Sequence, residues 1–223
     1  MTGTGRRRRG ITLIELLVAL VLSGFVIAAL VGVVSQLMRG EMQISAKAVV
    51  SGWTQMTQDS IQKEILNSTV LYCPYSNASH PGCPGPRSKV LSICNNYTLN
   101  PDYGAGPTGG PLDAGMPVSS RYYCVWSAGT PTGTPWLLRY AGSGCPISPT
   151  PVCGAGNFTV VAQDVHPFDA AQDFLFERDD SIAGVQLSFT IGRSTATADE
   201  PTPSYLKIQT RVSMQKATGN NFD

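Results

Sequence analysis

Residues 6–15 read Arg6-Arg7-Arg8-Arg9-Gly10-Ile11-Thr12-Leu13-Ile14-Glu15, and a largely apolar run follows as far as Met38. Glu15 is the one charged residue in this run. A carboxylate at the centre of a bilayer costs about 2.5–3.5 kcal/mol on insertion scales, so a spanning segment is not expected to keep one without a use for it. The stretch decides the fold because it predicts a membrane-spanning helix with a functional acid near its start.

The length of the apolar run separates this segment from an ordinary secretory signal. An ordinary signal has an apolar core of about 7–15 residues followed by a small-residue cleavage site, which Val18-Ala19-Leu20 matches poorly. Residues 11–38 would form a helix of about 42 Å at 1.5 Å per residue. This length exceeds the roughly 30 Å hydrocarbon core of a bilayer, so the helix can span it with tilt or project beyond it. An ordinary signal peptide or signal anchor is the alternative interpretation.

The arginine block, the Gly10/Ile11 junction and Glu15 together resemble the class III signal of type IV pilins and type II secretion pseudopilins. The resemblance implies that prepilin peptidase cuts between Gly10 and Ile11 on the cytoplasmic side and methylates Ile11. It also implies that Glu15 pairs with the N-terminal ammonium of a neighbouring subunit during filament assembly. Ile11 stands where the family usually has phenylalanine.

The charge distribution predicts the topology of the chain. Residues 1–10 hold four of the 16 basic residues and none of the 15 acidic ones, which leaves 12 basic against 15 acidic residues in 11–223. By the positive-inside rule the arginine block keeps the N-terminus cytoplasmic. The resemblance then implies a single-pass protein of the bacterial inner membrane with a periplasmic head, which later reaches the pilus or cell surface. The acidic balance predicts no strong nucleic-acid binding.

An amphipathic segment follows the apolar run. Apolar or small residues recur at three and four residues from Met42 to Ile65, which is a helical period. A single helix over 11–67 would be apolar all round in its first half and would pack one face on a sheet in its second half. The apolar set is Met42, Ala46, Val49, Val50, Trp53, Met56, Ser60, Ile61 and Ile65. For Gly24–Gly32 two interpretations stay open: a soft segment that unwinds in filaments, or close helix packing.

The rest of the chain predicts an α+β head with an antiparallel sheet and disulfide-bearing loops. Strand-like segments occur at 89–94, 121–127, 136–140, 158–164, 174–177, 182–191 and 205–215, and residues 195–203 form a polar hairpin loop. In the last two strands apolar residues alternate strictly with polar ones, so each should have one core face and one wet face. We expect five segments: 1–10 leader, 11–38 membrane or filament-core helix, 39–67 amphipathic helix, 68–157 irregular Cys/Pro/Gly-rich part, and 158–223 β part.

Six cysteines lie beyond the membrane segment, and an even count there predicts disulfides in an oxidising compartment. Cys145 and Cys153 flank a proline-rich loop, which favours that local pair. Cys73–Cys83 is a weaker second pairing, and it leaves Cys94 with Cys124. Zinc is disfavoured because no Cys-x-x-Cys pair is present.

Two further residue groups invite functional interpretations. The acidic residues Asp164, Asp169, Asp173, Glu177, Asp179 and Asp180 form a cluster that includes four calcium candidates, Asp169, Asp173, Asp179 and Asp180. The spacing fits no EF-hand loop, so a solvated acidic edge is the preferred interpretation and no cofactor is predicted. The aromatic residues Tyr122, Tyr123, Trp126, Trp136 and Tyr140 suit either an adhesive or DNA-stacking face or core packing, and core packing is preferred.

The functional hypothesis is a minor pilin that acts in pilus initiation and assembly. The order of 136–140, 160–165, 184–191 and 206–214 looks like minor pilins of the PilW type and the related J-type minor pseudopilins. The implied partners are other minor pilins, the major pilin, prepilin peptidase and the inner-membrane assembly platform. The alternatives are a minor pseudopilin of type II secretion, an adhesive or DNA-binding tip module, and a membrane-tethered enzyme using His166 or Asp164. No catalytic constellation is recognisable, so we predict that the protein is not an enzyme.

Overall fold

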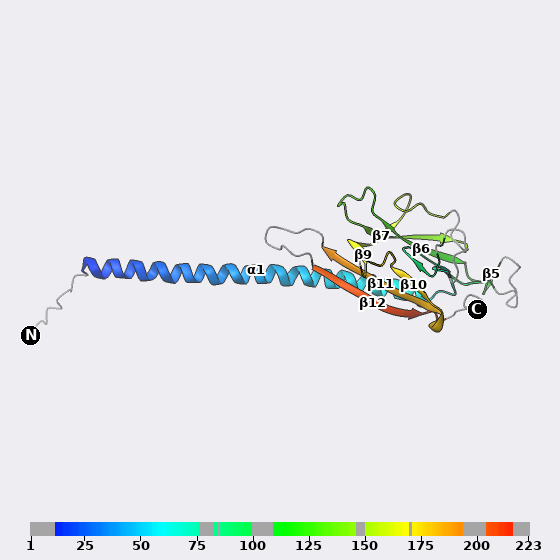
Figure 1. Cartoon of the computed structure of the whole chain (residues 1–223), viewed down its shortest axis with the longest axis horizontal. Coiled ribbons are helices and arrows are strands. Elements are labelled where there is room, and N and C mark those ends of the chain that lie inside the picture. The colour runs from blue at the N-terminus through cyan, green and yellow to red at the C-terminus, as the bar shows by residue number, and fades with distance from the viewer. Residues whose placement is uncertain are drawn as a thin grey trace, which may run out of the picture. The chain divides into compact units, whose positions relative to one another are not determined.

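The computed structural model describes residues 12–75, 83, 85–99, 109–145, 150–169, 171–193 and 204–215. A single helix, α1, runs over Leu13–Leu66, and the strands that follow it form the head (Figure 1). The chain divides into two compact units, Met1–Ala46 and Lys47–Asp223, so the second unit begins within the helix. The predicted α+β class with a long N-terminal helix is confirmed.

The end of α1 is fixed by bonds to its last turn. Both the backbone N–H and the side-chain amide of Asn67 donate to the carbonyl oxygen of Lys63, at 3.2 and 2.8 Å. The backbone N–H of Thr69 then donates to Cys94, which joins the chain to the first sheet. Further towards the N-terminus, nothing lies within 4 Å of where a Cβ on Gly24 or Gly32 would stand, so neither glycine serves close packing within this chain.

Five antiparallel strands form the first sheet in the spatial order β1-β3-β6-β7-β8. Its last strand, β8, is an edge strand and carries a bulge where its register with β7 shifts. Bulges blunt a sheet edge against further pairing. The strands are β1 (Val70–Cys73), β3 (Leu91–Asn95), β6 (Ser119–Trp126), β7 (Trp136–Ser143) and β8 (Thr159–Gln163).

The second sheet has the order β12-β11-β10-β2, and β9 also pairs with β11. β11 and β12 lie side by side over ten residues, from Gly184 opposite Ser213 to Arg193 opposite Ser204 (Figure 1). The predicted hairpin loop at 195–203 lies outside the described residues. The strands are β2 (Arg87–Ser88), β9 (Val165–Pro167), β10 (Phe176–Asp179), β11 (Gly184–Arg193) and β12 (Ser204–Ser213), and β4 (Tyr97–Thr98) and β5 (Gly110–Pro111) form a separate pair.

One hydrophobic core joins the last turns of α1 to both sheets. Ile61 and Ile65 are fully buried among side chains from each sheet, such as Leu137 of β7 and Phe189 of β11. Burying each such side chain stabilises the fold by roughly 1.5–3 kcal/mol. The head is therefore organised around the end of the helix.

The structure departs from the sequence prediction at the second face of β11. Val185, Leu187 and Phe189 face the core as expected, but Ser188 and Thr190 on the opposite face are buried too. The hydroxyl of Thr190 donates to the carbonyl oxygen of His166 in β9 at 3.4 Å, so this hydroxyl is hydrogen-bonded although the residue is buried. The prediction of a wet face for this strand was therefore wrong at Ser188 and Thr190.

Candidate functional site

The start of α1 brings two residues of the N-terminal motif together. The predicted processing residues Gly10 and Ile11 lie outside the described residues, so cleavage and methylation remain predictions. Thr12 is the N-cap, because its carbonyl oxygen accepts the bond from the backbone N–H of Leu16 at 3.2 Å. Its side chain and Glu15 complete the cap.

Thr12 and Glu15 form a reciprocal capping box. The backbone N–H of Glu15 donates to the hydroxyl of Thr12 at 3.3 Å, and the backbone N–H of Thr12 donates to the Glu15 carboxylate at 3.3 Å. This arrangement satisfies two of the N–H groups that a helix start leaves free, and it places a negative charge at the positive end of the helix dipole. The sequence prediction missed the capping role, although the Thr-x-x-Glu spacing at 12–15 was its signal.

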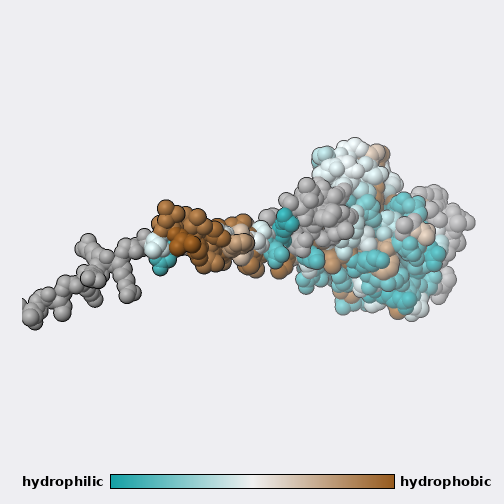
Figure 2. Space-filling view, turned by 60° about the vertical axis from the view of Figure 1, so that its left-hand side comes forward, coloured by the Kyte–Doolittle hydropathy of each residue, from teal (hydrophilic) through white to brown (hydrophobic). Residues whose placement is uncertain are grey.

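The helix after this cap is exposed and apolar over a membrane-spanning length. The segment Leu13–Glu41 has a mean hydropathy of 2.9 and none of its apolar window is buried within the chain. Figure 2 shows these hydrophobic residues in brown, while most of the visible head is hydrophilic. Large apolar side chains such as Phe25, 72% exposed, need lipid or another protein around them. The helix is therefore long and apolar enough to cross a membrane.

Glu64, near the other end of α1, holds the helix to the first sheet. Its carboxylate lies 2.9 Å from Arg139 Nη1 and 3.5 Å from Arg121 Nε, and it accepts a bond from the Tyr123 hydroxyl. Burial, and then the Glu64 carboxylate beside it, raise the pKa of the Tyr123 phenol well above its usual 10.0. Three donors on adjacent strands thus converge on one helical carboxylate. Sequence reasoning missed this cluster because its members are far apart in the chain.

The helical face that packs on the head matches the prediction only in part. Val50, Ile61 and Ile65 are buried as expected, together with Thr54 and Thr57, whereas the side chains of Met42 and Ala46 lie outside the described residues. Val49, Trp53 and Met56 are 59%, 51% and 74% exposed, and we call these three residues the exposed ridge. They lie beside the buried face and not on it.

Two hollows flank Trp53 in the groove between the exposed ridge and neighbouring strands. The first, of about 250 Å³, is bounded by Met56, Thr57 and Ser60 on the helix and by residues 159–161 of β8 and Arg139 of β7. The second, of about 230 Å³, is bounded by Val49, Val50, Gln163, Ile191 and Gly192. Trp53 lines both hollows.

The six cysteines form three disulfides, and two of the three pairings differ from the prediction. Cys73 pairs with Cys83 as expected, but Cys94 pairs with Cys145 and Cys124 with Cys153. Cys94 lies opposite Ser120 in the β3–β6 register, so Cys124 is four residues further along β6, about 13 Å away at 3.3 Å per residue. A disulfide needs Cα atoms within about 7 Å, which excludes Cys94–Cys124.

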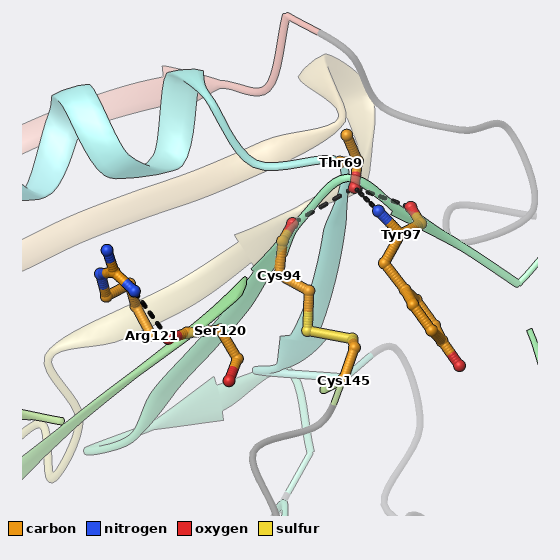
Figure 3. The surroundings of a disulfide bond; sticks show 6 residues. All are labelled: Thr69, Cys94, Tyr97, Ser120, Arg121 and Cys145. Atoms are coloured by element: carbon orange, nitrogen blue, oxygen red, sulfur yellow. Dashed lines mark hydrogen bonds between the residues drawn. A yellow bond between two sulfur atoms is a disulfide. The ribbon is translucent and has the colours of Figure 1, made fainter. Parts of the chain in front are cut away.

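Figure 3 shows the Cys94–Cys145 bond beside the start of the head. The hydroxyl of Thr69 donates to the carbonyl oxygen of Tyr97 at 2.7 Å and accepts from the backbone N–H of Tyr97 at 2.9 Å. It also lies 3.3 Å from the carbonyl oxygen of Cys94. The end of β7 is therefore tied covalently to β3, next to the chain that leaves α1.

The four calcium candidates bind different partners and do not converge. Asp173 pairs with Lys89, Asp180 with Arg178 at 2.5 Å, and Asp179 with Arg211 at 3.4 Å. Asp169 accepts a bond from the backbone N–H of Ala171 at 3.1 Å. Within the described ranges, no three His, Cys, Asp or Glu side chains are placed to hold a metal ion.

The aromatic residues of β6 and β7 divide between the two faces of the first sheet. Tyr123 is buried in the main core, whereas Trp126 and Trp136 pack edge to face, 5.8 Å apart, in a second cluster that contains the Cys124–Cys153 bond. Gly154 lies against the indole ring of Trp126 and has a φ of +88°. These contacts agree with the predicted core packing.

Asp164 and His166 form a hydrogen-bonded pair beside β9. His166 Nε2 lies 2.8 Å from Asp164 Oδ1, and the imidazole ring packs edge-on against Tyr205 with 6.0 Å between ring centroids. Asp164 is buried and has a φ of +55°. These are the two residues named for the enzyme alternative. Apart from Asp164, the described contact of the His166 ring is with the aromatic ring of Tyr205.

Comparison with known families identifies the N-terminal motif. Residues 5–31 match the model described as the prokaryotic N-terminal methylation motif. The matched segment covers the arginine block, the Gly10/Ile11 junction, the capping box and the exposed apolar helix as far as Val31. No curated protein and no solved structure matches the chain.

Proposed function

Because a chain with this motif is a type IV pilin-like prepilin, we propose that it acts as a minor pilin of a type IV pilus. The motif implies processing by prepilin peptidase and assembly with other pilins. One observation carries the proposal: the motif leads into a helix whose apolar window has no residue buried within the chain, and that helix continues into a folded, disulfide-linked head. Such a chain serves assembly through contact surfaces, so the proposal is structural and not enzymatic.

The proposed pathway begins in the bacterial inner membrane, with the arginine block cytoplasmic and the head periplasmic. Cleavage after Gly10 frees Ile11, whose methylated ammonium then lies close to Glu15 of a neighbouring subunit. A carboxylate inside a helix bundle is costly without a partner, so this pairing would fix the register between subunits. The proposed partners are other minor pilins, the major pilin and the assembly platform, and the proposed destination is the pilus at the cell surface.

Mass spectrometry of the N-terminus tests the pathway. The full chain is expressed with and without its cognate prepilin peptidase, and we expect a chain that begins at methylated Ile11 only when the peptidase is present. Gly10→Val should block the cut, whereas the matched variant Gly5→Val should leave it intact. A chain cut after the apolar segment, or an equal effect of the two glycine substitutions, would refute the proposal.

The phenotype of a deletion strain distinguishes a role in a type IV pilus from a role in type II secretion. Loss of surface pili with normal export of secreted enzymes supports the minor pilin. Loss of export with normal pili would instead assign the chain to the pseudopilus, where the same helix mechanics apply to a shorter filament.

A further inference from the structure

Four of the six cysteines are linked in an interlaced order. Cys94, Cys124, Cys145 and Cys153 follow one another along the chain, and the bonds join the first to the third and the second to the fourth. Four cysteines allow three pairings, and the native pairing is the one in which the two bonds cross. The remaining bond joins the two cysteines that come first in the chain, so its partners are consecutive.

An unfolded chain favours different partners for these four cysteines. A chain that enters an oxidising compartment behind its membrane anchor exposes Cys94 and Cys124 before Cys145, so these two can pair before a native partner arrives. Loop closure acts in the same direction, because Cys153 lies eight residues from Cys145 but 29 from Cys124. Closure probability falls as about the 3/2 power of loop length, which favours the local pair roughly sevenfold. Oxidation in chain order therefore yields Cys94–Cys124 and Cys145–Cys153.

The folded head cannot form while these non-native bonds persist. Cys94 lies beside Ser120 of β6 (Figure 3), and the β3–β6 register holds Cys94 and Cys124 about 13 Å apart. A bond between them and the first sheet therefore exclude each other. In the native head the same two cysteines are 0% and 2% exposed, so their sulfur atoms are closed to other thiols. The bonds must consequently be exchanged before β3 and β6 pair.

The exchange needs a thiolate that the oxidised chain does not contain. Thiol–disulfide exchange proceeds by attack of a thiolate on a disulfide sulfur, through a mixed disulfide. The sequence has six cysteines, and three bonds consume all of them. An external thiolate is therefore required to start the exchange. It is not consumed, because two disulfides are converted into two others without a change of oxidation state.

We propose that the head is a substrate of a periplasmic disulfide isomerase, a dithiol enzyme that converts the consecutive pairing into the native one. The enzyme thiolate attacks Cys145 in the Cys145–Cys153 bond and forms a mixed disulfide, and Cys153 leaves as a thiolate. Cys153 attacks Cys124 in the Cys94–Cys124 bond, and Cys94 leaves as a thiolate. Cys94 then attacks Cys145 in the mixed disulfide, which closes the native bond and releases the enzyme thiolate. The inference goes beyond the pilin function and rests on the periplasmic placement of the head.

Disulfide mapping in cells tests the proposal. The full chain is expressed in a host that has its periplasmic disulfide isomerase and in a strain that lacks it. Free thiols are blocked with N-ethylmaleimide, and peptides are mapped without reduction. In the deficient strain we expect the Cys94–Cys145 peptide to fall by roughly fivefold or more, given the bias of loop closure, with Cys94–Cys124 and Cys145–Cys153 peptides in its place. An isomerase whose second active-site cysteine is replaced by alanine should be recovered as a mixed disulfide with the chain.

Paired substitutions provide the matched control. Cys124→Ser together with Cys153→Ser leaves Cys94 and Cys145 as consecutive cysteines, so this variant should form its Cys94–Cys145 bond to the same extent in both strains. Cys94→Ser together with Cys145→Ser should likewise form Cys124–Cys153 equally in both. Because the readout is a bond and not a folded structure, each control remains valid where the variant head is unstable.

The outcomes separate this inference from the proposed function. Native pairing at the same yield in the deficient strain would overturn the inference and leave the pilin function intact. An equal dependence on the isomerase in the paired variants would also overturn it, because the interlaced order would then not be the cause. Six unpaired cysteines in both strains would refute the inference together with the periplasmic placement. Isomerase-dependent pairing in a chain that prepilin peptidase leaves uncut would support the inference and refute the pilin pathway.

Discussion

At the start of α1, the carboxylate of Glu15 accepts a hydrogen bond from the backbone N–H of Thr12, and the hydroxyl of Thr12 accepts one from the backbone N–H of Glu15. The same carboxylate is the one proposed to pair with a neighbour's N-terminus. Glu15 therefore has two separable properties, a hydrogen-bonding group that caps its own helix and a negative charge that is available to another subunit.

Substitutions at position 15 separate these properties. Glu15→Gln keeps an acceptor for the capping box but removes the charge, whereas Glu15→Ala removes both. We expect both variants to lose assembly, and only Glu15→Ala to fray the helix start, a loss of about 1 kcal/mol. Hydrogen exchange at residues 13–16 in detergent measures the fraying, and pilus counts measure assembly. Normal assembly of Glu15→Gln would show that the charge is not required.

Glu64 is expected to contribute more to stability than any exposed acidic residue of the head. Glu64→Gln leaves Arg139 and Arg121 without their anion in a mostly buried setting, so we expect a loss of about 2–4 kcal/mol in the free energy of unfolding. Glu177→Gln is the matched control, because its partner Arg87 is 63% exposed and such pairs contribute about 0–1 kcal/mol. Denaturant titration of the detergent-purified chains measures both values. Equal effects would show that the Glu64 cluster is not a structural anchor.

Alkaline pH should weaken the head through Tyr123. Its pKa is raised in the folded state, so above pH 10 the unfolded chain releases the phenol proton while the folded chain keeps it. Stability therefore falls as pH rises above 10, by up to about 1.4 kcal/mol per pH unit for this group. Tyr123→Phe should reduce the slope by that amount. Denaturation midpoints at pH 9, 10 and 11 measure it, and identical slopes for the two proteins would contradict the expectation.

The disulfide pattern is directly measurable. Peptide mapping without reduction should recover Cys94 linked to Cys145 and Cys124 linked to Cys153, and no Cys145–Cys153 peptide. Replacing Cys94 and Cys145 by serine should cost about 4 kcal/mol, given the 51-residue separation that this bond closes. Recovery of a Cys94–Cys124 peptide would overturn the observed register of β3 and β6.

Gly154 and Gly156 form a natural pair of test positions. Both have a positive φ, but a Cβ at 154 would stand 2.4 Å from Trp126 Nε1, whereas nothing lies within 4 Å of one at 156. Gly154→Ala should therefore cost about 1–3 kcal/mol more than Gly156→Ala, which carries the backbone strain alone. Equal melting temperatures for the two variants would indicate that the Trp126 side chain moves aside without loss of stability.

Local patterns in the sequence predicted most of the fold. Each of the seven predicted strand segments overlaps an observed strand, with ends shifted by at most three residues, because alternation and helical periodicity depend on neighbouring residues. The methylation motif is confirmed for the same reason. Strands of two or three residues, such as β2 and β9, were missed because they are too short to show a period.

The errors arose where distant parts of the chain decide the outcome. Cysteine pairing depends on strand register, which sequence separation does not reveal. The buried face of α1 was misjudged because Thr54 and Thr57 occupy core positions that an apolar pattern would assign to Trp53 and Met56. Their hydroxyls donate to the carbonyl oxygens of Val50 and Val161, so they can be buried without leaving an unpaired group.

The Cys94–Cys145 bond also determines how the head carries a mechanical load. When tension enters through α1 and leaves beyond residue 145, the backbone path runs from Cys94 across the sulfur atoms to Cys145. The 51 residues between the two cysteines would span roughly 170 Å if fully extended, and pulling cannot release this length while the bond is intact. β6 and β7 both lie within that bypassed loop, so the force does not pass through their backbone. A subunit stretched within a fibre would keep the two strands that hold Glu64.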